Sequence, residues 1–364
     1  MKQILSTRPA PNNSSSILIS ILYLVRIITW PCNSVKKHYH RRGRPYVYSP
    51  TIIIQCFIVR IWLRLDSNRS LHHFLCLDLP YNKKVMKACG LSDAYLPSRR
   101  TFDRRLKTVS NDIKERIAAM GNLFVFEGLV EPYVIAIDST LLKSKGHAVW
   151  HASSMSKGIV PRSGIDTHSR WGFSHTRGWI FGYKLHMVSS TDSLIVPLVA
   201  DVTTANIPDN HVYSDLLSSP SSPSSPNNSN SSLSLETLKK IHFVAADPGY
   251  DDKSLYDLSM KMGFQLVCPV RRYRNTSEER LQLVDFYESA LGQVIYSKRY
   301  ISIEPLIEHI KSIFRIDPVP ARGYDKVRGI LLLSVLLYQL LVYYNCKIQK
   351  KNNPRRMLKY MIGC

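Results

Sequence analysis

Apolar residues follow two different rhythms along this chain of 364 residues. Between about residues 49 and 126 they recur at helical spacing, beginning with the stretch "SPTIIIQCFIVRIWLRL", whose Ser-Pro pair is typical of a helix start. From Tyr133 onward, short apolar runs alternate with polar residues or stop at turn residues, as β-strands do. The pattern predicts a small all-helical region followed by a region that mixes strands and helices.

The second region contains one long segment that cannot pack. Residues 218–235 are almost entirely Ser, Pro and Asn, which predicts a disordered surface loop, and such loops are tolerated because closure entropy grows only slowly with loop length. Around it we expect strands and helices that build an α/β fold, a mixed sheet flanked by helices. The expected strands are 133–138, 179–190, 193–204, 241–247 and 264–270, and the expected helices are 251–263, 304–315 and 325–345.

Composition shifts predict four parts along the chain. These are a basic, poorly ordered N-terminal arm (1–45), a helical domain (46–130), the α/β domain (131–346) and a basic tail (347–364). Two apolar segments, 17–30 and 329–346, also permit an alternative as a membrane protein with two spans. The first is interrupted by Arg26, and the second is short and carries Ser334 and Gln339, which favours a buried core helix.

The charge of the chain changes the picture of its partners. With 49 Lys and Arg against 27 Asp and Glu, the formal net charge is +22, which favours a polyanion, either nucleic acid or an acidic membrane surface. The cluster "SRRTFDRRLK" (98–107) places Arg104 and Arg105 on a short helix that Ser98 can cap, as in a helix that reads the DNA major groove. A basic helix that only faces solvent would have the same pattern.

The seven cysteines form no CxxC pair and no zinc-type spacing with histidine, which indicates a reducing, intracellular compartment.

Three acidic residues stand where a purely structural residue would be costly or unexpected. The apolar runs "VIAID" and "FVAAD" end on Asp138 and Asp247, and a carboxylate at the edge of a core needs a partner or a cation. Glu304 opens a predicted helix and shares its polar face with Lys311, two turns further on. Carboxylate oxygens suit Mg²⁺ or Mn²⁺ rather than zinc. A turn-forming aspartate and a glutamate at a helix start would explain the same pattern without metal.

Several motifs, in the same order, resemble those of the DDE transposases of prokaryotic insertion sequences. They are "AIDST" (136–140), "AADPGYDD" (245–252) and "YSKRYISIEPLIEHIK" (296–311), with "RGWIFGYKLH" (177–186) and "DVTTANIPDN" (201–210) between them, and the resemblance runs from about Tyr48 to Asn345. It implies a ribonuclease-H-like core in which Asp138, Asp247 and Glu304 are catalytic and bind metal. One departure is the spacing from Arg299 to Glu304, which leaves four residues where the common signature has three.

The resemblance implies a transposase that cleaves DNA strands at terminal inverted repeats and joins the freed 3′-hydroxyls to target DNA. Such an enzyme would use Mg²⁺ or Mn²⁺, with two ions, and would act as a homodimer on double-stranded DNA in the cytoplasm, at the nucleoid. The residues expected to contact DNA are Tyr296, Arg299, Lys311, Arg104, Arg105 and Lys184. The alternative is a catalytically decayed or co-opted sequence-specific DNA-binding protein.

Overall fold

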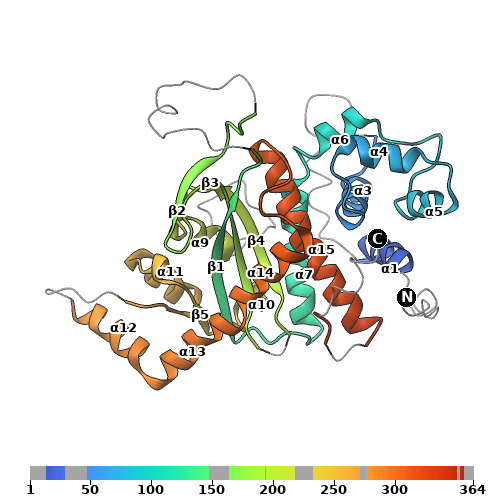
Figure 1. The fold of residues 1–364 in the computed structure, drawn as a ribbon. Coiled ribbons are helices and arrows are strands. Elements are labelled where there is room, and N and C mark those ends of the chain that lie inside the picture. The colour runs from blue at the N-terminus through green and yellow to red at the C-terminus, as the bar shows by residue number, and fades with distance from the viewer. Residues whose placement is uncertain are drawn as a thin grey trace. The chain divides into compact units, whose positions relative to one another are not determined.

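A computed structural model describes residues 14–28, 47–146, 164–192, 194–217, 233–270, 277–350 and 353–355 (Figure 1). The chain divides into two compact units, one formed by Met1–Arg116 with Leu332–Cys364 and the other by Ile117–Leu331. The division falls within two helices, α7 (Ser110–Phe126) and α15 (Tyr324–Lys347), whereas the sequence predicted boundaries at residues 130 and 346.

The first unit is helical, as the periodicity of its apolar residues predicts. Its complete helices are α1 (Ser14–Ile27), α3 (Pro50–Trp62), α4 (Asn68–Cys76), α5 (Pro80–Ala88) and α6 (Arg99–Arg105). The predicted Ser-Pro start is present in α3, where the Ser49 side chain accepts a hydrogen bond from the Ile52 amide and Pro50 occupies the first turn.

Part of the expected N-terminal arm is a packed helix. Leu18, Ile21 and Leu22 of α1 are fully buried, and α1 packs against α3 and α5. The amide of Gln55, in α3, donates a 2.7 Å hydrogen bond to the Leu22 carbonyl. The apolar residues of α1 form a helical stripe, but the polar segments on either side of it favoured an unpacked arm in the sequence. The rest of the arm, apart from Ile28, lies outside the described residues.

The second unit is built on a six-stranded sheet whose central strand is β1 (Val134–Lys143). On one side β1 pairs antiparallel with β3 (Gly178–Ser190), and on the other it pairs parallel with β5 (Phe243–Ala245), which pairs parallel with β6 (Gln265–Val267). Two further strands share the outer edge of β3, β2 (Arg170–Ser174) along its first half and β4 (Pro197–Thr204) along its second. The predicted mixed sheet flanked by helices is confirmed.

Strands β4, β5 and β6 are shorter than the predicted ranges, and two further differences concern β1 and β2. The central strand continues past Asp138 to Lys143, because β3 pairs with it from Ile135↔Ser190 as far as Lys143↔Gly182. Asp138 therefore lies in the middle of a strand and not at its end. The hairpin strand β2 was not predicted, since its sequence "RWGFS" is too short and too polar to stand out.

Helices surround the sheet of the second unit. They are α9 (Asn210–Leu217), α10 (Leu235–Leu238), α11 (Lys253–Met262), α12 (Glu278–Glu288), α13 (Ala290–Ile301) and α14 (Ile303–Phe314), with a 3₁₀ turn η1 (Pro248–Tyr250). The predicted end of α11 at Gly263 is confirmed, with that glycine in the left-handed conformation at φ 88°. Helix α13 packs against β1, β5 and β6, and α14 packs against β1 and β3.

One described helix, α15 (Tyr324–Lys347), is long and apolar enough to cross a membrane by length and composition. Its most apolar window is 89% buried inside the protein, which is typical of the core helix favoured by the sequence.

Two predicted segments fall mainly outside the described residues. Of the loop 218–235 only Leu233, Ser234 and Leu235 are described, and there Leu233 is buried and Ser234 caps α10. Of the basic tail, the structure describes only residues 347–350 and 353–355.

Candidate active site

Asp138 and Asp247 reach the same level of the sheet from neighbouring parallel strands. The register of β1 and β5 pairs Ala136 with Ala245, and each aspartate follows two residues later. Asp138 is 8% exposed and accepts a 2.8 Å hydrogen bond from the Ser139 amide. Asp247 is half-buried and caps η1 by accepting a 2.9 Å bond from the Gly249 amide. The pair therefore brings two carboxylates close together at the centre of the sheet.

Arg299 joins Asp138 to Glu304. At the end of α13, its guanidinium lies 3.0 Å from Asp138 Oδ2 and 3.2 Å from Glu304 Oε1. The chain breaks its helical path at Ser302, between α13 and α14, so Arg299 and Glu304 lie on different helices and still meet. The additional residue between them thus does not separate the two groups.

The pKa values of these groups are shifted because three acids surround one guanidinium. Burial and the nearby Asp247 raise the pKa of Asp138 to about 7, although Arg299 and the Ser139 amide act in the opposite direction. Burial and Asp209 raise the pKa of Asp247. Burial alone would lower the pKa of Arg299, but the carboxylates of Asp138, Glu304 and Asp247 raise it above its ordinary value.

Asp209 is a further acid at this site that the sequence did not single out. It directly precedes α9 and accepts a 3.0 Å hydrogen bond from Lys184 Nζ. A Cβ built on Gly249 would lie 3.0 Å from Asp247 Oδ1 and 3.8 Å from Asp209 Oδ2, so both carboxylates line the same small space. The only signal in the sequence was an aspartate before a helix, which is also typical of a simple helix cap.

The Tyr250 hydroxyl lies beside these acids. It is buried and makes no hydrogen bond within the described part of the chain. Burial raises the pKa of Tyr250 far above its ordinary value, and Asp209, Asp138 and Asp247 add to the effect. A buried polar atom without a partner, beside three acids, marks a position where a polar or charged group can be accommodated.

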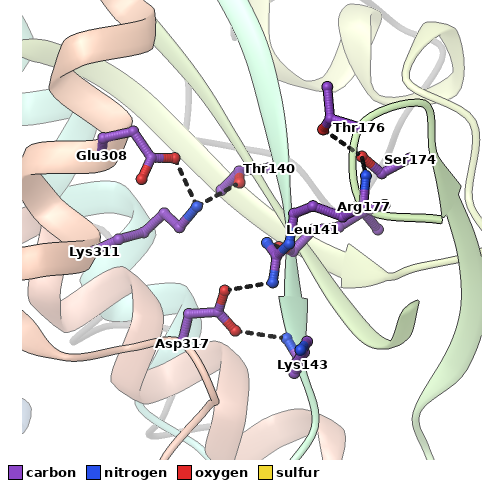
Figure 2. A network of polar contacts seen from close by, with 9 residues as sticks. All are labelled: Thr140, Leu141, Lys143, Ser174, Thr176, Arg177, Glu308, Lys311 and Asp317. Carbon is purple, nitrogen blue, oxygen red and sulfur yellow. Dashed lines mark hydrogen bonds and ion pairs between the residues drawn. The ribbon is translucent and has the colours of Figure 1, made fainter. Parts of the chain in front are cut away.

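Lys311 approaches β1 from α14 (Figure 2). Its ammonium lies 2.7 Å from Glu308 Oε1 and 3.5 Å from Thr140 Oγ1. Because successive side chains of a strand alternate between faces, Thr140 shares a face of β1 with Asp138. Lys311 therefore supplies positive charge on the face that carries the first aspartate.

One comparison with known proteins, the family model, identifies the domain that contains this site. The family model described as "Transposase DDE domain" matches residues 130–340, which is more than half of the chain. The chain belongs to this family.

A search of curated proteins finds no match to the chain. Among solved structures, "Crystal structure of a pre-cleavage Mos1 transpososome" matches over 92% of this chain and 98% of its own, with 9% identity and a TM-score of 0.19. A TM-score at this level supports no shared fold.

The other residues expected to contact DNA lie in different surroundings. Lys184 is largely buried against Asp209 and the Ile207 carbonyl, and Tyr296 packs in a core cluster with Ile295 and Val134, so neither side chain faces outward. In the helical unit, Arg104 is exposed, whereas Arg105 is 3% exposed. The side chains of Lys184, Tyr296 and Arg105 are therefore largely buried within the protein. Arg104 is exposed to solvent, and Arg299 faces the acids.

The carboxylates of this candidate site have the donor chemistry of a divalent metal site, although the described residues form no ready metal cage. Transposases of this family generally use divalent metals. Among the described residues, no three His, Cys, Asp or Glu side chains are arranged to hold a metal ion, and Arg299 lies between Asp138 and Glu304. The oxygen donors of Asp138 and Asp247, with raised pKa values and a nearby unpartnered hydroxyl, fit a hard cation such as Mg²⁺.

Proposed function

We propose that this protein is an active transposase that cleaves DNA strands at the ends of an insertion sequence and transfers the freed ends to target DNA. The observation that carries the proposal is the meeting of Asp138, Asp247 and Glu304 around Arg299, from three separate elements of a family-matched domain. The order β4-β3-β1-β5-β6, antiparallel on one side of β1 and parallel on the other, supports a ribonuclease-H-like core.

In this proposal Asp138, Asp247 and Glu304 hold two Mg²⁺ or Mn²⁺ ions. Bound divalent ions supply an activated oxygen nucleophile and stabilise the leaving oxygen of a phosphodiester. Glu304 is more exposed than Asp138, with 41% of its side chain accessible against 12%, so it is better able to exchange its ion pair with Arg299 for another cation. The high pKa of Asp138 makes its readiness to accept a cation depend on pH.

The basic residues of the site position DNA. Arg299 holds Asp138 and Glu304 together and leaves positive charge beside the acids, where a phosphate of the substrate must lie. Lys311 provides a second cation on the same face of β1. Lys184 acts indirectly, since its ammonium fixes Asp209 beside Asp247.

The helical unit binds the ends of the element in this proposal. Exposed basic side chains on α5 and α6 and in the turn after α6 contact the DNA, namely Lys83, Lys84, Lys87, Arg99, Arg100, Arg104 and Lys107. Other exposed basic side chains of this unit include Arg26, Arg64 and Arg69. Arg60 donates to Asn68 at 3.0 Å and Asn68 to Asp103 at 2.8 Å, which ties α3, α4 and α6 together and orients α6. A homodimer acting on paired ends at the nucleoid completes the proposal.

The substitution Asp247→Asn tests this function. The substrate is a duplex carrying the DNA that flanks the coding region, incubated with the full chain and Mg²⁺. We expect Asp247→Asn to abolish strand cleavage and to leave binding in a gel-shift assay unchanged, because one metal-binding oxygen is lost while the basic surface stays intact. Asp257→Asn, on the exposed side of α11, is the matched control and should cleave normally. Full cleavage by Asp247→Asn would refute the proposal.

A further inference from the structure

The hairpin formed by β2 and β3 carries two large aromatic side chains in solvent. Phe173 is 53% exposed and Trp179 is 67% exposed, and the two residues lie directly opposite each other in the antiparallel register. Their ring centroids are 5.4 Å apart in an edge-to-face arrangement. Leaving two such rings in water forfeits the free energy of their burial, which indicates a surface that is covered during function.

The exposed pair is the outer end of an aromatic ladder. The next cross-strand pair, Trp171 and Phe181, has ring centroids 5.3 Å apart, and Phe181 is buried. The ladder therefore runs from the core of the sheet to the tip of the hairpin. Because Phe181 is buried, the inner pair holds the exposed pair in a fixed orientation.

The ladder shares a face of the sheet with Asp138. Met187 of β3 pairs with Asp138, and Trp179 precedes Met187 by eight residues, an even number that returns the side chain to the same face. The turn of the hairpin bends back toward β1, because the Arg177 guanidinium reaches the carbonyl of Leu141, three residues from Asp138.

Hydrogen bonds clamp the turn of the hairpin to the body of the sheet (Figure 2). Arg177 donates to the Leu141 carbonyl at 3.0 Å and to Asp317 Oδ2 at 2.9 Å, while Asp317 Oδ1 accepts from the Lys143 amide at 2.9 Å. Within the turn, the Arg177 amide donates to Ser174 Oγ. The aromatic pair is therefore preorganised, so that little further ordering is needed when it is covered.

Positive charge surrounds the base of the hairpin. Lys143, Lys145, Arg170 and Arg322 are all exposed there. The guanidinium of Arg170 donates to the carbonyls of Thr167 and Ser169, and the ammonium of Lys145 donates to that of Pro320, contacts that leave their positive charge in place. Flat rings flanked by cations complement a flexible polyanion that carries flat rings of its own.

We propose that the Phe173–Trp179 pair stacks on an unpaired base of the DNA strand whose phosphate backbone reaches the acid site. The inference rests on the proposed function, since it names a contact that the substrate makes beside the acid site. The pair recognises the π-face of a base and not its edge, so it is indifferent to sequence.

Fluorescence anisotropy of the full chain tests this contact. One probe is a labelled duplex with a single-stranded tail of about ten nucleotides, within the usual size range of single-strand sites on proteins. The other is a blunt duplex of the same paired length. Phe173→Ala with Trp179→Ala should weaken binding of the tailed probe by about 5- to 100-fold for each base stacked. Binding of the blunt probe should stay the same.

Two single variants separate stacking from an apolar contact. Trp179→Phe retains a ring and should bind the tailed probe nearly as the wild type does. Trp179→Leu retains only apolar character and should lose the preference for the tailed probe over the blunt one. Phe126→Ala, at a side chain that is also exposed but lies at the end of α7, is the control and should bind both probes normally. Unchanged circular dichroism and thermal unfolding verify that the double variant is folded.

Three results would overturn the inference: unchanged binding of the tailed probe by the double variant, equal loss on both probes, or wild-type binding by Trp179→Leu. The last would assign the pair to an apolar protein partner. These results are independent of the Asp247→Asn assay. A tail preference lost in the double variant, together with full cleavage by Asp247→Asn, would leave base stacking in place and remove the transposase mechanism.

Discussion

Two neighbouring charged clusters of the second unit differ in how their charge is balanced. The first is Asp209 with Lys184, and the second is Asp138, Asp247 and Glu304 with Arg299. Asp209 has its own cation, Lys184, at 3.0 Å, and a neutral neighbour, His186, whose Nδ1 lies 3.5 Å away, beyond a good hydrogen bond. Asp138, Asp247 and Glu304 share the single guanidinium of Arg299. The first cluster is complete within the protein, and the second has more negative than positive charge. A surplus of carboxylates is what a site for cations requires.

Among the variants that test this comparison, Glu304→Gln should have the largest effect on strand cleavage. It removes one acid from the unbalanced cluster, and we expect loss of cleavage below detection because the oxygen donor set is incomplete. Glu308→Gln, one turn further along α14 and ion-paired with Lys311, is the matched control and should stay close to wild type. The measurement is strand cleavage in Mg²⁺ at equal protein concentrations. Equal activities of the two variants would place Glu304 outside the chemistry.

Asp209→Asn should have an intermediate effect. The substitution removes a charge that is already paired with Lys184 and leaves Asp247 in place with less support, so we expect cleavage to fall by about 10- to 100-fold and not to vanish. The loss should lie in the turnover number, with little change in DNA affinity. Complete loss, as for Asp247→Asn, would move Asp209 into the unbalanced cluster, and no loss would separate the two clusters functionally.

The smallest effect is expected on the stability of the protein at acid pH. It comes from His186, which lies beside Asp209 in the balanced cluster. Burial lowers the pKa of His186 to about 4, although Asp209 acts in the opposite direction and Lys184 adds to the lowering. Its usual pKa in an unfolded chain is about 6.5, so between these values the unfolded state binds more protons and stability falls as the pH is lowered. The loss is about 3 kcal/mol, is nearly but not fully complete at pH 4 and is absent above about pH 7.

Urea unfolding from pH 7.5 to pH 4 in wild type and His186→Gln measures this effect, with pH values chosen to bracket the titration. Glutamine retains a hydrogen-bonding group toward Thr203, whose hydroxyl lies 2.8 Å from His186 Nε2. The relevant quantity is the slope of the unfolding free energy with pH, which should be shallower in the variant even if its absolute stability is lower. Parallel slopes in the two proteins would show that His186 does not titrate in this range.

Local pattern was sufficient for several features of the molecule. The apolar run before Asp138 predicted a buried strand, helical periodicity placed Glu304 and Lys311 on one helix, and Gly263 predicted a helix end. Each of these depends on a repeat of two or 3.6 residues, or on the conformational freedom of one glycine, and such signals are contained in a few neighbouring residues.

The amino-acid sequence by itself determined the alternation of elements, the positive charge and the identity of three acids that resemble a known signature. Only the tertiary structure decided that Arg299 bridges Asp138 and Glu304 and that Asp209 lies beside Asp247. It also decided that Lys184 binds Asp209 and that the short strand β2 pairs its aromatic side chains with those of β3. Arg299 and Asp138 are separated by 161 positions in the chain. Contacts of that kind depend on chain closure and on the competition among all possible partners, and no local periodicity encodes them.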